Sequence, residues 1–211
     1  MSVLVKICGI TNLPDAQMAA EAGADLLGFM FYEGSTRAIP IEAAAKIIKQ
    51  LPPWVVKVGV FVNPTGEEVR QAVSACSLSM LQFHGEEPPE FCTQFGIMSI
   101  KAMSIRDETS IEALPAYHTE AWLLDSYVPG QKGGTGETFN WDLAVKARKL
   151  GRPIFLAGGL NPGNVADAVT QVRPYGVDVS SGVESAPGRK DPQKVRDFIS
   201  AAKSAARELA G

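Results

Sequence analysis

The chain has 211 residues, of which 45% are hydrophobic and 20% charged, and its formal net charge is -3. This is the composition of an ordinary globular protein, and it excludes a disordered or collagen-like chain. The 20 basic residues are not clustered into the patch that binds nucleic acid, and no apolar run approaches the ~18 residues that cross a bilayer. We therefore expect a cytoplasmic protein without nucleic-acid or membrane partners.

Cysteine and histidine are both scarce. The three cysteines, Cys8, Cys76 and Cys92, are an odd and sparse set, which fits reduced thiols in the cytosol better than a disulfide framework. The only two histidines lie far apart in the sequence, so no zinc-type ligand cluster is predicted.

Short β-rich runs alternate with helical patterns eight times. The predicted strands are residues 3–8, 25–31, 55–62, 80–84, 98–102, 121–125, 153–157 and 176–180. Helical patterns include residues 13–22, 41–51, 67–75, 164–172 and 195–209. The residues predicted to cap helix starts are Asn12, Asn63, Asn161 and Asp191.

The alternating order of strands and helices predicts a parallel sheet. Two closures compete: an open doubly wound sheet and a closed (βα)8 barrel. The chain length lies near the lower bound of ~200 residues for such barrels, and an open sheet of eight parallel strands is less common. We predict one α/β domain over residues 1–211, a single (βα)8 TIM barrel with short loops. Within it, residues 129–136 form a loop and not a domain boundary.

The alternation of side chains along the predicted strands brings three reactive residues to one place. In the first, fourth and sixth predicted strands, one face is apolar and suits packing against helices. The other faces carry Leu4, Lys6 and Cys8 in the first strand, Met80, Gln82 and His84 in the fourth, and Ala121, Leu123 and Asp125 in the sixth. These faces therefore point into the barrel. Cys8, His84 and Asp125 each end a strand, at the rim where barrels of this kind carry their chemistry.

Each of these residues has a structural and a functional interpretation. Cys8 is either a small buried hydrophobe or a thiolate that acts as base or nucleophile. Lys6 shares its face but lies one layer deeper. Asp125 is either a loop brace or, if partly buried, a general acid. For His84 we favour a satisfied polar group inside the rim over a catalytic role. Trp54, Trp122 and Trp141 are expected to be packing residues.

Three glycine-rich stretches follow the last three strands. They are Gly133-Gly134-Thr135-Gly136, Ala157-Gly158-Gly159-Leu160 and Ser180-Ser181-Gly182-Val183. Any one of them is readily explained as a turn, but together they favour a cradle of backbone N–H groups for phosphate. The first is not a Walker A loop because Glu137 stands at the lysine position. No dinucleotide fingerprint follows the first strand. Arg37 is either a solvated loop residue or a ligand for a substrate carboxylate.

These residues together resemble the phosphoribosylanthranilate isomerase family over nearly the whole chain. The resemblance lies in Val5-Lys6-Ile7-Cys8-Gly9-Ile10-Thr11, Gly28-Phe29-Met30-Phe31, Ser35-x-Arg37, Val58-Gly59-Val60-Phe61-Val62-Asn63, Leu81-Gln82-Phe83-His84-Gly85, Leu124-Asp125, the three glycine-rich stretches, and Gly176-Val177-Asp178-Val179-Ser180-Ser181-Gly182-Val183-Glu184.

The resemblance implies an Amadori rearrangement of N-(5-phosphoribosyl)anthranilate in tryptophan biosynthesis, without cofactor or metal. It implies Cys8 as general base, Asp125 as general acid and Arg37 as the ligand of the anthranilate carboxylate. The further substrate-binding residues that we predict are His84, Gly134, Gly158, Gly159, Asp178, Ser180, Ser181 and Gly182. The partner is thus a small phosphorylated sugar-anthranilate, and the sequence leaves monomer and homodimer both open.

Two alternatives differ in their chemistry. The related histidine-pathway isomerase performs the same rearrangement on a bis-phosphate, but such enzymes carry Asp where Cys8 stands and need a second phosphate site, for which the early loops offer no glycine-rich cradle. A non-catalytic barrel that binds a phosphorylated ligand would explain the glycine-rich loops but leaves Cys8 and Asp125 without a role.

Overall fold

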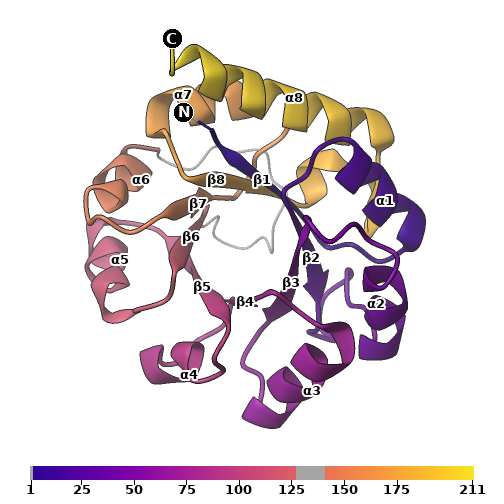
Figure 1. The fold of residues 1–211 in the computed structure, drawn as a ribbon. Helices are drawn as coiled ribbons and strands as arrows, with labels where there is room; N and C mark the ends of the chain where they lie inside the picture. The colour runs from indigo at the N-terminus through magenta and orange to yellow at the C-terminus, as the bar shows by residue number, and fades with distance from the viewer. Residues whose placement is uncertain (1, 127–140) are drawn as a thin grey trace.

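The computed structural model describes residues 2–126 and 141–211, in which eight parallel strands close into a barrel (Figure 1). The strands are β1 (Leu4–Cys8), β2 (Leu26–Met30), β3 (Val56–Phe61), β4 (Met80–Phe83), β5 (Met98–Ile105), β6 (Ala121–Ser126), β7 (Ile154–Leu156) and β8 (Gly176–Val179). Strand β8 pairs in parallel with β1. The predicted closed barrel is therefore confirmed, and the open sheet is excluded.

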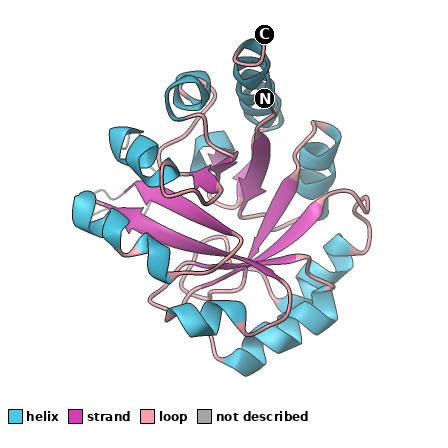
Figure 2. Ribbon diagram, turned by 60° about the vertical axis from the view of Figure 1, so that its left-hand side comes forward, coloured by secondary structure: helices cyan, strands magenta, loops and turns pink. Residues whose placement is uncertain are grey.

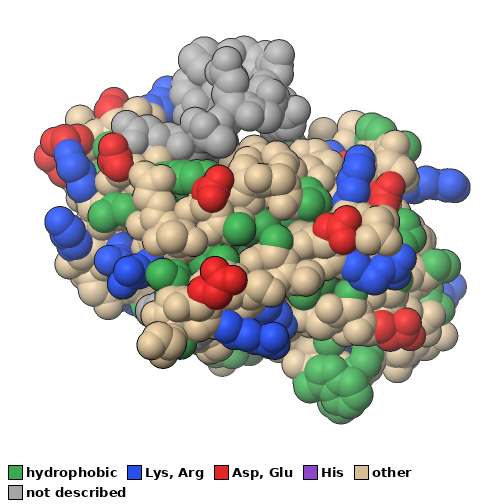
Figure 3. Space-filling model, turned by 90° about the horizontal axis from the view of Figure 1, so that it is seen from above, with side chains coloured by type: hydrophobic (Ala, Val, Ile, Leu, Met, Phe, Trp, Pro, Cys, Tyr) green, Lys and Arg blue, Asp and Glu red, His purple; other side chains and the backbone are tan. Residues whose placement is uncertain are grey.

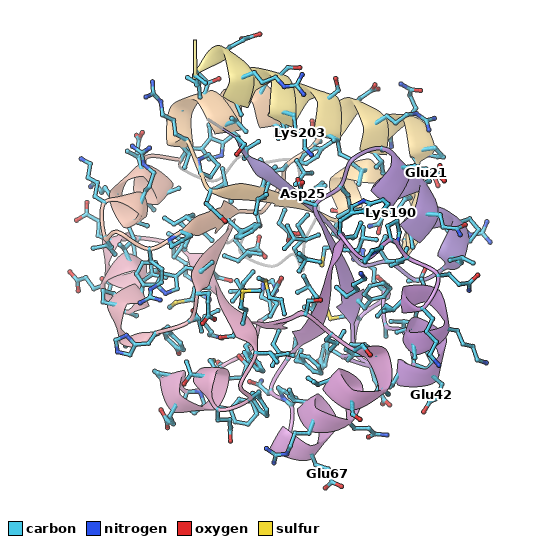
Figure 4. The ribbon with its side chains drawn as sticks, in the orientation of Figure 1. Glu21, Asp25, Glu42, Glu67, Lys190 and Lys203 are labelled. Carbon is cyan, nitrogen blue, oxygen red and sulfur yellow. The ribbon has the colours of Figure 1, made fainter. Side chains whose placement is uncertain are left out.

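Helices surround the barrel on its outer side (Figure 2). They are α1 (Leu13–Glu21), α2 (Ile41–Ile48), α3 (Gly66–Cys76), α4 (Pro89–Thr93), α5 (Glu108–Glu112), α6 (Trp141–Arg148), α7 (Val165–Val172) and α8 (Pro192–Glu208), with 3-10 turns η1 (Leu114–Ala116) and η2 (Ser181–Val183). Helix α8 lies beside α1 and α7 and completes the ring (Figure 1). Figure 4 shows Lys203 of α8 directed at Asp25, whose carboxylate it contacts at 3.1 Å.

Two apolar clusters fill the molecule, one on each side of the barrel wall. The interior cluster contains Cys8, Leu26, Val58, Val60, Ile100, Ala102, Ala121, Leu123, Phe155 and Ala157. The opposite strand faces, including those of Val5, Ile7, Leu81, Phe83, Trp122 and Leu124, pack in the cluster shared with the helices. The predicted facing of strands β1, β4 and β6 is therefore confirmed, and with it the position of their last residues at the rim.

Helix starts were predicted correctly at two of four asparagine or aspartate residues. Asn12 accepts a hydrogen bond from the Asp15 backbone and caps α1, and Asp191 caps α8. Asn63 does not cap α3: Thr65 is its N-cap, and the Asn63 side chain instead accepts from the Glu86 backbone at 2.7 Å. Asn161 does not cap α7 either: the N-cap position belongs to Asn164, and the Asn161 side chain accepts from the Gly163 backbone at 2.8 Å. In both cases the asparagine that was taken as a helix cap accepts a hydrogen bond from the backbone of a loop.

A two-stranded hairpin, β9 (Glu184–Ala186) and β10 (Arg189–Lys190), follows β8 and was not predicted. Its turn places Pro187 before Gly188, which has φ +75°, the residues and conformation of a type II turn. Proline and glycine at these two positions were the sequence signal for it. The hairpin brings Glu184 and Lys190 to the rim of the barrel.

The surface shows no strong segregation of charge on the face drawn in Figure 3, where acidic and basic side chains alternate. Among the described residues, no helix is both long and apolar enough to span a membrane.

The expectation that all three tryptophans pack inside was wrong for Trp54, which is 76% exposed, whereas Trp122 is buried. Trp54 lies in the loop between α2 and β3.

Candidate active site

One cavity at the carboxyl ends of the strands collects the predicted site residues. Its volume is about 180 Å³. Its lining includes Cys8, Arg37, His84, Asp125, Gly158, Gly159, Asp178, Ser180, Ser181 and Gly182. Gly134 lies outside the described residues. Every other residue that the sequence assigned to catalysis or substrate binding thus lines this cavity.

Cys8 ends β1 above a buried ion pair. Lys6, two residues earlier on the same strand, is fully buried and its Nζ lies 2.9 Å from Oδ1 of Asp178 on β8. Burial lowers the pKa of Lys6, but the charges of Asp178 and Cys8 raise it by more, to about 12. Burial raises the pKa of the Cys8 thiol, and the Lys6 ammonium partly opposes that rise. Lys6 therefore acts electrostatically on the Cys8 thiol although it lies one layer deeper.

Asp125 ends the inward face of β6 and meets His84, which follows β4. The His84 Nε2 atom lies 3.3 Å from Asp125 Oδ2, and both side chains are about one-third exposed. On its other side His84 Nδ1 lies 3.2 Å from the Gln82 amide nitrogen. Because an amide nitrogen only donates, Nδ1 accepts and the neutral ring carries its proton on Nε2. Nε2 is also the ring nitrogen that lies near Asp125.

Arg37 lies in the loop after β2 and is held by the β9–β10 hairpin. Its Nε donates to Oε1 of Glu184 at 2.8 Å, and its Nη2 donates to Oε2 at 2.7 Å. Lys190 also donates to Glu184, at 2.9 Å. Figure 4 shows Lys190 within the ring of helices, whereas Glu42 and Glu67 point outward. Burial raises the pKa of Glu184, but Arg37 and Lys190 lower it by more.

The glycine-rich loops after β7 and β8 pack tightly together. Gly158 and Gly159 have φ of +81° and +65°, a conformation that L side chains rarely adopt. The amides of Asn161 and Asn164 both donate to the Gly159 carbonyl, at 3.3 and 3.0 Å. A Cβ on Gly182 would lie 1.9 Å from the carbonyl oxygen of Leu160. Only glycine therefore allows these two backbones to approach so closely.

Glu184 and Lys190 are site residues that the sequence analysis did not single out. Glu184 is the last residue of the motif that ends in Gly182-Val183-Glu184, but its partner Arg37 is 147 positions away. No local pattern links two such residues. A metal centre finds no support in the described ranges 2–126 and 141–211, where no group of three His, Cys, Asp or Glu side chains converges.

Comparison with known proteins identifies the family. Residues 5–201 match the family model of N-(5'-phosphoribosyl)anthranilate (PRA) isomerase. The chain belongs to the phosphoribosylanthranilate isomerase family. It is therefore an enzyme of the isomerase class that serves tryptophan biosynthesis, as the resemblance of its motifs implied.

Members of the phosphoribosylanthranilate isomerase family match this chain over nearly its whole length. The curated enzyme of Geobacter metallireducens is 54% identical over 96% of this chain and 100% of its own length. The crystal structure of the Thermotoga maritima enzyme has a TM-score of 0.91 and 46% identity, and covers 96% of this chain and 99% of that one. A second structure, at TM-score 0.87 and 44% identity with the same coverage, is a complex with reduced 1-(o-carboxyphenylamino)-1-deoxyribulose 5-phosphate.

Proposed function

We propose that this chain catalyses the Amadori rearrangement of N-(5-phosphoribosyl)anthranilate to 1-(2-carboxyphenylamino)-1-deoxyribulose 5-phosphate, with Cys8 as general base and Asp125 as general acid. The observation that carries the proposal is the single cavity into which β1 brings a thiol, β6 a carboxyl group and the loops after β7 and β8 a glycine-rich rim. The family relative crystallised with a reduced form of this product supports the same substrate class.

The proposed substrate has three recognisable parts, and the cavity offers a different set of groups to each. The phosphate is assigned to the rim formed by Gly158, Gly159, Ser180, Ser181 and Gly182, whose backbone N–H groups suit an anion.

The anthranilate carboxylate is assigned to Arg37. Glu184 occupies the Nε–Nη2 edge of that guanidinium, so the carboxylate would bind the edge formed by Nη1 and the second Nη2 hydrogen. The ribose then lies between Cys8 and Asp125, with Asp178 and His84 beside it.

The first step opens the ribose ring. Asp125 gives a proton to the ring oxygen, the bond between that oxygen and C1 breaks, and the lone pair of the anthranilate nitrogen forms an iminium ion with C1. His84 Nε2 lies 3.3 Å from Asp125 Oδ2, so the polar ring stands beside the negative charge that develops as the carboxylate forms. Stabilisation that grows along the reaction is the kind that lowers a barrier.

The second step moves a proton from carbon. The Cys8 thiolate removes the proton at C2, and the electron pair of that C–H bond neutralises the iminium to give an enolamine. The enolamine then takes the proton back from the Cys8 thiol at C1 and gives its C2 hydroxyl proton to the Asp125 carboxylate, so that C2 becomes the ketone of the product. Both side chains thereby return to their starting forms, and no external oxidant or reductant takes part.

Turnover of freshly generated phosphoribosylanthranilate by the purified chain tests the proposal. We expect Cys8→Ala and Asp125→Asn each to lower kcat by about 10²–10⁴-fold, the usual value of one positioned proton-transfer group. Cys92→Ala, which removes a buried thiol outside the cavity, and Asp197→Asn, on the exposed side of α8, are the matched controls.

Retention of most turnover by either active-site variant would reject the assigned role. A folded wild-type chain that binds inorganic phosphate but converts no substrate would favour the non-catalytic barrel. Conversion of the histidine-pathway bis-phosphate alone would favour the related isomerase.

A further inference from the structure

The space beside Cys8 is shared with a buried lysine. Cys8 is the register partner of Gly28 on β2, and Lys6 is the register partner of Asp178 on β8. A Cβ on Gly28 would lie 2.8 Å from the Cys8 sulfur and 3.0 Å from the Lys6 nitrogen. The nitrogen and the sulfur are therefore no more than about 6 Å apart, within the range at which an opposite charge stabilises an anion.

Lys6 lies in the barrel interior, where most of the side chains are apolar. The interior cluster around it consists of residues such as Leu26, Val58, Ile100 and Leu123. A buried ion pair in such a place is seldom more stable than a well-packed apolar pair, because both charges lose their hydration. The Lys6–Asp178 pair therefore calls for an explanation beyond stability. A lysine ammonium has three donors, and Asp178 accepts one of them at 2.9 Å.

We propose that Lys6 is a positioning residue for the reaction: its buried ammonium stabilises the thiolate form of Cys8, and Asp178 fixes that ammonium in place. Gly28 contributes because it has no side chain to fill the space between the Cys8 sulfur and the Lys6 nitrogen. The inference rests on the proposed function, in which Cys8 is the base. It adds the group that opposes the effect of burial on the Cys8 thiol.

The other charges near Cys8 are already committed to one another. Lys190 from β10 and Arg37 from the loop after β2 both favour the thiolate, but both are bound to Glu184. Asp178 from β8 disfavours the thiolate. His84 and Asp125 line the same cavity from the opposite strands and pair with each other. Lys6 is also paired, with Asp178, but it lies on the same strand as Cys8, two residues away.

The test measures ionisation of Cys8 in the substrate-free enzyme by the ultraviolet absorbance of its thiolate. The same titration of a Cys8→Ala chain is subtracted, which removes the signals of Cys76 and Cys92. We expect Lys6→Met to raise the pKa of Cys8 by about one to two pH units, and Asp178→Asn to lower it. A role in packing alone would not move the two values in opposite directions.

Lys57→Met is the matched control. Lys57 is also buried, but it faces the helix layer and donates to the carbonyl of Pro52. We expect it to leave the Cys8 pKa unchanged. Should Lys6→Met fail to fold, Lys6→Met/Asp178→Asn removes both charges of the pair and is compared with Asp178→Asn. An equal Cys8 pKa in those two chains would overturn the proposal.

Kinetics separate this inference from the proposed function. If Lys6 acts through Cys8, the alkaline rise of kcat/KM in Lys6→Met shifts to higher pH by the same amount as the thiolate titration, and turnover at neutral pH falls about 10–100-fold. A shifted thiolate titration with an unshifted rate profile would overturn the role of Lys6 in the reaction. Absence of turnover in the wild-type chain would instead reject the proposed function, while the thiolate titration still reports on Lys6.

Discussion

Arg37 and Glu184 form a bidentate ion pair at the rim of the barrel. The two residues are 147 positions apart in the chain, and two hydrogen bonds of 2.8 and 2.7 Å join them. Lys190 binds the same carboxylate from the next strand of the hairpin. The pair fixes the plane of the guanidinium and leaves one of its edges for a ligand, so the placement of Arg37 depends on a hairpin far along the chain.

Glu184→Gln is therefore expected to weaken substrate binding more than the chemical step. The guanidinium loses its charged anchor, and we expect KM for phosphoribosylanthranilate to rise about tenfold with a smaller change in kcat. Steady-state kinetics measures both constants. Glu67→Gln is the control, because Glu67 points away from the barrel (Figure 4).

Measurements of unfolding free energy distinguish a misplaced Arg37 from a general loss of stability. Glu184→Gln leaves the Lys190 ammonium buried without its carboxylate and is expected to cost about 3 kcal/mol of unfolding free energy. Glu184→Gln/Lys190→Met removes that unpaired charge and should recover most of the stability. We expect KM to stay high in the double variant. Recovery of a normal KM there would mean that Glu184 does not position Arg37.

Gly182→Ala is expected to force the loops after β7 and β8 apart. Its Cβ would lie 1.9 Å from the carbonyl oxygen of Leu160, a backbone atom that cannot swing away. We expect a KM increase of at least tenfold and a loss of about 1–3 kcal/mol of stability, the usual cost of overpacking. Inhibition by inorganic phosphate should weaken in parallel. Gly66→Ala, whose nearest neighbour is the flexible end of Arg70, is the control, and phosphate inhibition equal to that of wild type would contradict the prediction.

The Lys101–Glu87 ion pair is expected to stabilise the barrel from its outer side. Both side chains are 2% exposed, and Lys101 Nζ lies 2.7 Å from Glu87 Oε2. Glu87 also accepts from the backbone of Asn63 and Gly85, so it connects the loops that follow β3 and β4. We expect Lys101→Met to lower the unfolding free energy by about 3–5 kcal/mol, because it leaves Glu87 buried and unpaired.

Urea denaturation measures that loss, and Lys146→Met supplies the comparison. Lys146 pairs with Glu108 on the surface, where the two side chains are 54% and 70% exposed. Exposed pairs contribute about 0–1 kcal/mol. Equal losses in the two variants would show that burial of the Lys101–Glu87 pair has no energetic consequence.

Alkaline pH is expected to destabilise the fold through its buried thiols. Burial raises the pKa of Cys76 and of Cys92 to about 11, from 9.0 in the unfolded chain. The folded chain therefore binds these protons more tightly than the unfolded chain. The resulting stability is fully present below pH 9 and declines as the pH rises toward 11. Lys6, with a pKa of about 12 against 10.5 unfolded, acts in the same direction at higher pH.

Unfolding free energies between pH 8 and about 11.5 measure this decline. The comparison chain is Cys76→Ala/Cys92→Ala, in which neither position titrates. We expect its stability to fall less steeply over the same interval, whatever its stability at neutral pH. Parallel curves for the two chains would contradict the assignment.

The sequence alone predicted the barrel and the strand ends that line its cavity. Apolar periodicity located all eight strands, and the two-residue alternation of a strand decided which face of β1, β4 and β6 points inward. The positions of Cys8, His84 and Asp125 followed from this alternation. Once the apolar residues are assigned to the helix side, the residue at the end of the other face must point into the barrel. Family motifs added Arg37 and the glycine-rich loops after β7 and β8.

Only the tertiary structure decided how these residues are held. The contacts of Arg37 with Glu184, of Lys6 with Asp178, and of Asn63 with the loop after β4 join segments that are distant in the chain. Hydrogen bonds and ion pairs act over about 3 Å, whereas sequence patterns record only which face of an element a residue occupies. Closure of the barrel brings β8 against β1, and this closure, not any local pattern, places a lysine and a carboxylate beneath the Cys8 thiol.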